Sequence, residues 1–158
     1  MVFVTLGTQD KPFLRLLEEV EKEIDKGTIN DKVIVQAGVT KFKSTKMEIF
    51  DLMPMDQFEE LVSKCDLLIT HGGVGSILEG LKKNKKVIAV PRLKKYKEHI
   101  NDHQLQIINR FDEAGYIIGL TDLNDLGSAL KKAKNFKPNK YKSNTKNMIK
   151  IVEKCINS

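Results

Sequence analysis

The residues best suited to chemistry lie in one short stretch, 71-HGGVGS-76, which follows the apolar run 67-LLIT-70 and precedes Glu79. Glycine lets the main chain approach a ligand closely and adopt positive φ. A helix that begins after such a turn directs free N–H groups and a positive dipole end at an anion. Because the Ser76 hydroxyl adds a donor, the stretch predicts a phosphate-binding turn; the alternative is a tight turn without a ligand.

Two common phosphate motifs do not fit this turn. A Walker A motif needs Gly-Lys-Ser or Gly-Lys-Thr, and neither tripeptide occurs in the chain. A dinucleotide motif GxGxxG that starts at Gly73 would end at Leu78, and the turn follows the fourth predicted strand rather than the first. A second glycine turn, 6-LGTQ-9, follows the first predicted strand and is expected to face 71-HGGVGS-76 across the site.

Short apolar runs alternate with amphipathic stretches along the 158 residues. This order predicts a single α/β domain (1–158) with a doubly wound, mainly parallel, Rossmann-like sheet. The predicted strands are 2–6, 33–37, 47–50, 67–70, 87–90 and 116–119. The predicted helices are 12–26, 56–65, 75–83, 99–114, 122–134 and 143–157, the last in a basic helical region at about 135–158.

Composition narrows the function classes. No apolar run reaches the roughly 20 residues of a membrane span, and the N-terminus lacks the features of a secretory signal, so a cytoplasmic protein is expected. Cys65 and Cys155 form no CxxC motif, which argues against a zinc or disulfide framework. No two aspartates are spaced i, i+2, and we expect no cofactor and no essential metal.

The net charge of +6 is uneven, because after Asp125 the only acidic residue is Glu153. Lysines there, and in 82-KKNKK-86 and 94-KKYK-97, could meet an anionic lipid surface or an acidic partner. They could equally form a solvated face. Nucleic acid is disfavoured, since aromatic residues make up only 6% of the chain and no recognition motif occurs.

Three motifs in order carry a family resemblance: 3-FVTLGT-8, 71-HGGVGSILEGL-81 and 101-NDHQ-104, with Val90-Pro91 ending the strand before the last. The chain resembles the nucleotide-sugar domain of GT-B glycosyltransferases. It is most similar to the family 28 C-terminal domain and to its small stand-alone versions. These serve in two-component transferases of dolichol-linked oligosaccharide synthesis and of capsule and exopolysaccharide synthesis.

The resemblance implies a role for each matching residue. Glu79 would bind the ribose hydroxyls, and Met55, within 53-MPMDQ-57, would lie beside the uracil. Asn101, His103 and Gln104 would contact the donor sugar, although helix capping by Asn101 or Asp102 is an alternative. The whole set expected to bind the nucleotide and its diphosphate is Gly7, Thr8, His71, Gly72, Gly73, Val74, Gly75, Ser76 and Glu79.

The resemblance also implies that this chain supplies only the donor-binding half of a two-part enzyme. The expected reaction is inverting, metal-independent transfer of a hexose, with galactose as the first expectation, from a UDP-sugar to a lipid-linked saccharide. A membrane-anchored, acceptor-binding partner subunit would hold this chain peripherally at the inner face of the cell membrane. No confident catalytic base is found, and His71 and His103 are candidates. The alternative is a non-catalytic subunit that binds the nucleotide-sugar and enhances a partner enzyme.

Overall fold

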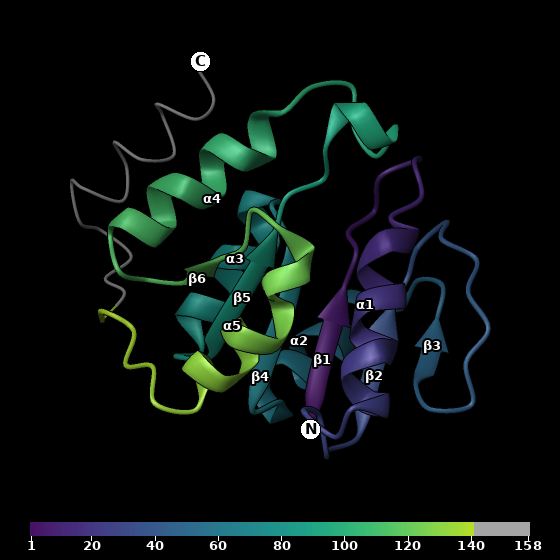
Figure 1. Cartoon of the computed structure of the whole chain (residues 1–158), viewed down its shortest axis with the longest axis horizontal. Helices are drawn as coiled ribbons and strands as arrows, with labels where there is room; N and C mark the ends of the chain where they lie inside the picture. Colours follow the sequence, from purple (N-terminus) through teal and green to yellow (C-terminus); the bar gives the residue numbers. More distant parts are fainter. Residues whose placement is uncertain (141–158) are drawn as a thin grey trace.

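A computed structural model describes residues 1–140, so the predicted helix 143–157 lies outside the described residues. The described chain forms one parallel sheet covered by helices on both faces (Figure 1). The strands are β1 (Val2–Thr5), β2 (Val33–Gln36), β3 (Glu48–Phe50), β4 (Leu67–His71), β5 (Lys86–Val90) and β6 (Ile118–Gly119). The α-helices are α1 (Leu14–Asp25), α2 (Met55–Lys64), α3 (Val74–Lys82), α4 (His103–Glu113) and α5 (Leu126–Ala133). The 3-10 turns are η1 (Lys94–Tyr96) and η2 (Leu123–Asp125).

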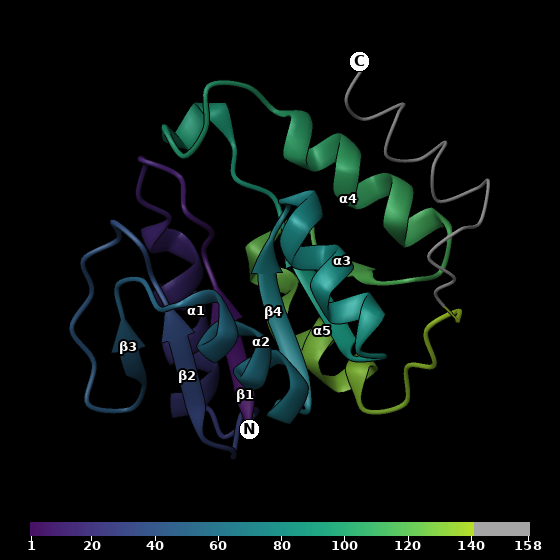
Figure 2. The same cartoon turned by 180° about the vertical axis from the view of Figure 1, so that it is seen from behind.

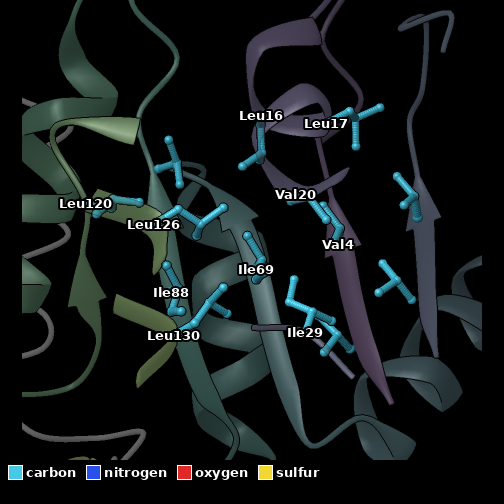
Figure 3. Packing of buried hydrophobic residues seen from close by; sticks show 14 of the residues in the cluster. Val4, Leu16, Leu17, Val20, Ile29, Ile69, Ile88, Leu120, Leu126 and Leu130 are labelled. Carbon is cyan, nitrogen blue, oxygen red and sulfur yellow. The ribbon is translucent and has the colours of Figure 1, made fainter. Parts of the chain in front are cut away.

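Side chains alternate between the two faces of the sheet, as the period of a β-strand requires. Val2 and Val4 of β1 join the core beneath α1 and α5, shown in Figure 3, whereas Phe3 joins the core beneath α2, α3 and α4. Figure 2 shows α2 and α3 in front of the sheet. Since both faces are covered, every residue of β1 and β2 is buried, and the predicted doubly wound α/β fold is confirmed.

The strand order is β3-β2-β1-β4-β5-β6, with every neighbouring pair parallel. The connections leave β1 in one direction and β4 in the other, so the order reverses between these two central strands. In open parallel sheets, ligands bind outside the carboxyl ends of the strands at such a reversal. The fold therefore brings the turns after β1 and β4 together.

Three predicted boundaries were wrong. The helix expected over 122–134 begins at Leu126, because the preceding residues form the 3-10 turn η2. The helix expected over 99–114 begins at His103, because residues 99–102 form a loop in which the Asn101 side chain accepts a hydrogen bond from the His103 N–H at 3.0 Å. The strand expected over 116–119 is reduced to Ile118–Gly119 at the sheet edge. Within residues 1–140, no helix is both long and apolar enough to cross a membrane.

Candidate functional site

A pocket of about 470 Å³ opens at the carboxyl ends of β1 and β4. The turn after β1 forms one wall, the start of α3 forms another, and the segment between β3 and α2 closes the side. Its lining residues are Thr5, Gly7, Thr8, Gln9, Gln36, Leu52, Met53, Met55, Phe58, His71, Gly73, Gly75, Ser76 and Glu79. The pocket thus brings together most of the side chains and glycines that the sequence assigned to nucleotide and diphosphate binding.

The N-terminus of α3 forms the polar end of this pocket. The first i→i−4 main-chain hydrogen bond of α3 runs from the Ile77 N–H to the Gly73 carbonyl, at 3.2 Å. The N–H groups of Val74, Gly75 and Ser76 precede it and therefore have no partner within the helix. Together with the helix dipole they favour an anion at this end.

Glu79 lies on the same side of α3 as Ser76, and both line the pocket, as their spacing predicted. The Glu79 side chain is 22% exposed and forms an ion pair with Lys83, one helical turn later, at 3.0 Å. This bond uses Oε1, so the carboxylate keeps further acceptor capacity for hydroxyl groups.

The glycines of 71-HGGVGS-76 have different surroundings. A Cβ atom on Gly75 would have no heavy atom within 4 Å, so this position opens into the pocket. A Cβ on Gly73 would lie 2.3 Å from His71 Cε1, and one on Gly7 would lie 2.5 Å from His71 Nε2. Gly7 and Gly73 are therefore required by the packing of the His71 ring, independently of any ligand.

His71 ends β4 and is 5% exposed. Burial, and the nearby Arg92 cation, lower the pKa of His71 to about 3. A neutral imidazole with this pKa is a weak proton acceptor at neutral pH, which argues against His71 as the catalytic base.

Of the residues assigned to the donor sugar, none lines this pocket. Gln104 is 3% exposed, and its amide contacts the ends of β4 and β5. Asn101 accepts a hydrogen bond from the His103 N–H, two residues later. The N-cap residue of α4 is Asp102, whose side chain makes no capping hydrogen bond to the helix and accepts one from the Lys94 N–H. His103 lies beside Gln106, with Nδ1 3.1 Å from the Gln106 Oε1. Gly72, assigned to the diphosphate, is buried and does not line the pocket. Sugar contact by Asn101, His103 and Gln104 stays a prediction.

Arg92 was missed by the sequence reasoning, although it follows Val90-Pro91 directly. Its side chain is 1% exposed and donates hydrogen bonds to the carbonyls of Leu6, Lys11 and Glu98. It thereby ties the loop after β1 to the loop after β5. The sequence offered one signal, a basic residue directly after a strand end. Because arginine is rarely buried, that signal did not indicate an inward-facing side chain.

The Glu98 carboxylate completes this connection. It accepts two hydrogen bonds from the Arg15 guanidinium, both at 2.9 Å, and is itself 4% exposed.

Among residues 1–140, no group of three or more His, Cys, Asp or Glu side chains is placed to hold a metal ion.

Comparison with known proteins agrees with this architecture. Residues 1–157 match the model of the glycosyltransferase family 28 C-terminal domain, and the chain belongs to that family. The chain is 30% identical, over 127 residues and 76% of its length, to the human UDP-N-acetylglucosamine transferase subunit ALG13. It is 31% identical, over 81 residues and 51% of its length, to the Candida albicans protein of the same name.

The match covers 11% of the human relative and 26% of the Candida albicans relative, so the chain spans a minor part of both proteins. The NMR solution structure of ALG13 superposes with a TM-score of 0.62 at 21% identity, covering 96% of this chain and 93% of that one. The kitacinnamycin glycosyltransferase superposes with a TM-score of 0.58 at 18% identity, covering 84% of this chain and 34% of that one. These two likenesses establish the shared fold.

Proposed function

We propose that the chain binds a UDP-sugar and, with a partner subunit, transfers the sugar to a lipid-linked saccharide. One observation carries the proposal: a single pocket at the reversal between β1 and β4 combines a helix N-terminus with an acceptor carboxylate on the same helix. The helix N-terminus suits a diphosphate, and the Glu79 carboxylate suits the two hydroxyl groups of a ribose.

The rest of the pocket suits the other parts of this donor. Leu52, Met53 and Met55 supply an apolar wall between β3 and α2 for the uracil ring. Thr8 and Gly7 face α3 from the turn after β1, so the diphosphate would lie between the two central turns. Main-chain N–H groups would stabilise the leaving diphosphate electrostatically, so the transfer proposed here requires no divalent metal ion.

Two lines of evidence bear on which sugar is transferred. Galactose is the expectation that follows from the sequence motifs. The curated relatives are named as UDP-N-acetylglucosamine transferase subunits, which favours N-acetylglucosamine for this chain as well. Inversion at the anomeric carbon follows from the family resemblance. Because the pKa of His71 is lowered to about 3, we do not assign His71 as the base that deprotonates the acceptor. His103 and a group of the partner subunit are the proposed candidates.

The distribution of exposed apolar side chains supports the partner. Among residues 1–140, large hydrophobic side chains that are exposed occur at the carboxyl edge of the sheet, in strand-end loops or at the first residue of the following helix. They are Leu14, Val39, Leu52, Met55, Tyr96 and Ile100. A sheet edge that carries exposed apolar side chains is a candidate interaction surface. A membrane-anchored, acceptor-binding subunit on this edge would close the donor pocket.

The proposal is tested by titration calorimetry with UDP in EDTA. The wild-type chain is expected to bind UDP, and Glu79→Ala is expected to lose roughly 1–3 kcal/mol of binding free energy, because it removes a charged acceptor from two hydroxyl groups. Glu60→Ala is the matched control, since Glu60 forms an i, i+4 ion pair with Lys64 on α2 and does not line the pocket. Absence of UDP binding by both the chain and its complex with the partner would refute the proposal.

The non-catalytic alternative is separated by a second measurement. Transferase activity of the complex is compared between wild type and Glu79→Ala at donor concentrations well below KM, where the rate reports kcat/KM. A variant that loses donor binding but leaves turnover by the complex intact would identify the chain as an enhancer of a partner that carries its own donor site.

A further inference from the structure

The contacts of the Gln104 amide define a buried junction behind the pocket. Its oxygen, Oε1, accepts hydrogen bonds from the main-chain N–H groups of Gly72 and Arg92, each at 3.0 Å. Its nitrogen, Nε2, lies 3.1 Å from Nδ1 of His71. One side chain of α4 therefore joins the ends of β4 and β5 and contacts the histidine that ends β4.

These contacts determine which end of the amide is the oxygen. A main-chain N–H is a donor only, so the atom that two such groups approach must be an acceptor. In the reversed orientation the NH₂ group would face two donors and leave both buried N–H groups unsatisfied, at about 1–3 kcal/mol each. The orientation in which Oε1 faces Gly72 and Arg92 is therefore strongly preferred.

The position of the proton on His71 follows from this orientation. The Gln104 NH₂ group donates toward Nδ1, so Nδ1 must carry a lone pair. A neutral imidazole has one N–H, which is then on Nε2. The neutral state is supported by the burial of the ring and by the neighbouring Arg92 cation, which lower its pKa to about 3.

The glycines allow the ring and the amide to meet. A Cβ on Gly72 would lie 2.7 Å from the Gln104 Cβ, and Cβ atoms on Gly7 and Gly73 would collide with the edge of the His71 ring that carries Cε1 and Nε2. Gly7, Gly73 and His71 all line the pocket. The Nε2–H group consequently lies at the wall between the two central turns.

We propose that Gln104 is a positioning residue that fixes His71 as the Nε2–H tautomer, so that the histidine presents a hydrogen-bond donor to the pocket. This role uses one of the two N–H groups of Nε2, so it is separate from the sugar contact predicted for Gln104. The recipient of the His71 hydrogen bond, an oxygen of the bound diphosphate, rests on the proposed function; the tautomer does not.

The first test is the tautomer of His71 in the ligand-free full chain. Long-range ¹H–¹⁵N correlation NMR, detected on the carbon-bound ring hydrogens, distinguishes the two neutral tautomers and the imidazolium. The chain has three histidines, and the signals lost in His71→Asn identify His71. We expect the Nε2–H pattern, unchanged between pH 8 and pH 5. A Nδ1–H pattern or an even mixture would overturn the proposal.

The second test changes the donor while preserving the shape. In Gln104→Glu, a carboxylate beside Arg92 keeps both acceptor bonds but offers no N–H to Nδ1. His71 is then expected to become Nδ1–H or imidazolium at pH 8. The matched control is Gln106→Glu, which alters a glutamine beside His103 on the same helix and should leave the His71 signals unchanged. An unchanged His71 pattern in a folded Gln104→Glu chain would contradict the proposal, and the wild-type spectrum decides if this variant does not fold.

Addition of UDP separates this inference from the proposed function. If both hold, UDP shifts the His71 Nε2 and Hε1 signals while the tautomer pattern persists. If His71 is the Nε2–H tautomer and UDP leaves its Nε2 and Hε1 signals unshifted, the positioning role of Gln104 is supported. The same result counts against diphosphate binding at His71.

Discussion

The glycines of the central turn serve two different purposes at the scale of single residues. Gly72 and Gly73 leave room for Gln104 and His71, which are parts of the protein itself. Gly75 has open space in front of it and is the position at which the main chain is accessible to a ligand. One motif thus combines internal packing with exposure of N–H groups.

This difference predicts opposite effects for two similar substitutions. Gly75→Ala should retain or raise the unfolding free energy by up to about 1 kcal/mol, since alanine favours a helix over glycine. The same methyl group should weaken UDP binding by about tenfold, because it occupies the pocket. Thermal unfolding and UDP titration measure the two effects.

Gly73→Ala is the comparison variant, and it should lower the unfolding free energy by about 1–3 kcal/mol because its Cβ overlaps the His71 ring. Equal unfolding free energies for Gly73→Ala and Gly75→Ala would show that the His71 ring can move to make room for the added methyl group.

The buried His71 also predicts a dependence of stability on pH. Its pKa is lowered from 6.5 to about 3 in the folded chain, so between these values the unfolded chain binds the proton more strongly. Stability is therefore lost as the pH falls below about 6.5, at up to about 1.4 kcal/mol per pH unit, or about 2 kcal/mol by pH 5. The lowered pKa of His99, due to burial and Arg92, acts in the same direction.

Urea unfolding of wild type and His71→Asn at several pH values between 7 and 5 measures this contribution. The variant should show the shallower loss, whatever its absolute stability. Parallel pH profiles for the two chains would indicate that His71 titrates normally in the folded state.

At the scale of elements, the connection between two loops depends on Arg92. Its guanidinium reaches carbonyl groups on the loops after β1 and β5, and it lies over the Phe13 ring at 5.2 Å from the ring centroid. Arg92→Met should lower the unfolding free energy by about 3 kcal/mol, because buried carbonyls lose their donors and Glu98 loses a nearby positive charge.

Denaturant unfolding of Arg92→Met measures this loss. Lys22→Met is the control, because Lys22 is 64% exposed and its ion pair with Glu19 should contribute less than about 1 kcal/mol. A loss no larger than that of the control would mean that the two loops are held by other contacts.

The sequence predicted the elements better than their contacts. The strands were recognisable because both faces are buried, which produces uninterrupted apolar runs such as 87-VIAV-90. The pocket was predictable because glycine turns follow the two central strands. The inward direction of Gln104 was not predictable, because it depends on how α4 packs against β5 and β6. Arg92 bonds to Leu6, which is 86 residues away, and no local pattern reports such a pair.

At the scale of the whole molecule, the exposed apolar side chains lie at the carboxyl edge, and one of them, Tyr96, is flanked by the lysines of 94-KKYK-97. Without its partner, the chain is expected to self-associate through this edge. Sedimentation velocity should show faster sedimentation at higher concentration, and Val39→Ser with Ile100→Ser should weaken the association at least tenfold by removing buried apolar area.

The control for this measurement is Lys64→Ser on α2, which should associate as the wild type does. Neither Val39 nor Ile100 lines the pocket, so UDP binding by the double variant should be unchanged. Concentration-independent sedimentation of the wild type would argue against self-association through the carboxyl edge.

The central place of β1 has a consequence for synthesis on the ribosome. Val2 pairs with Val33 on one side and with Leu67 on the other, so the second neighbour of β1 is translated 65 residues later (67 minus 2). At typical elongation rates this delay is roughly 3 to 13 s. During that time an apolar strand has an unpaired edge, which makes the nascent chain a substrate for chaperones until β4 emerges.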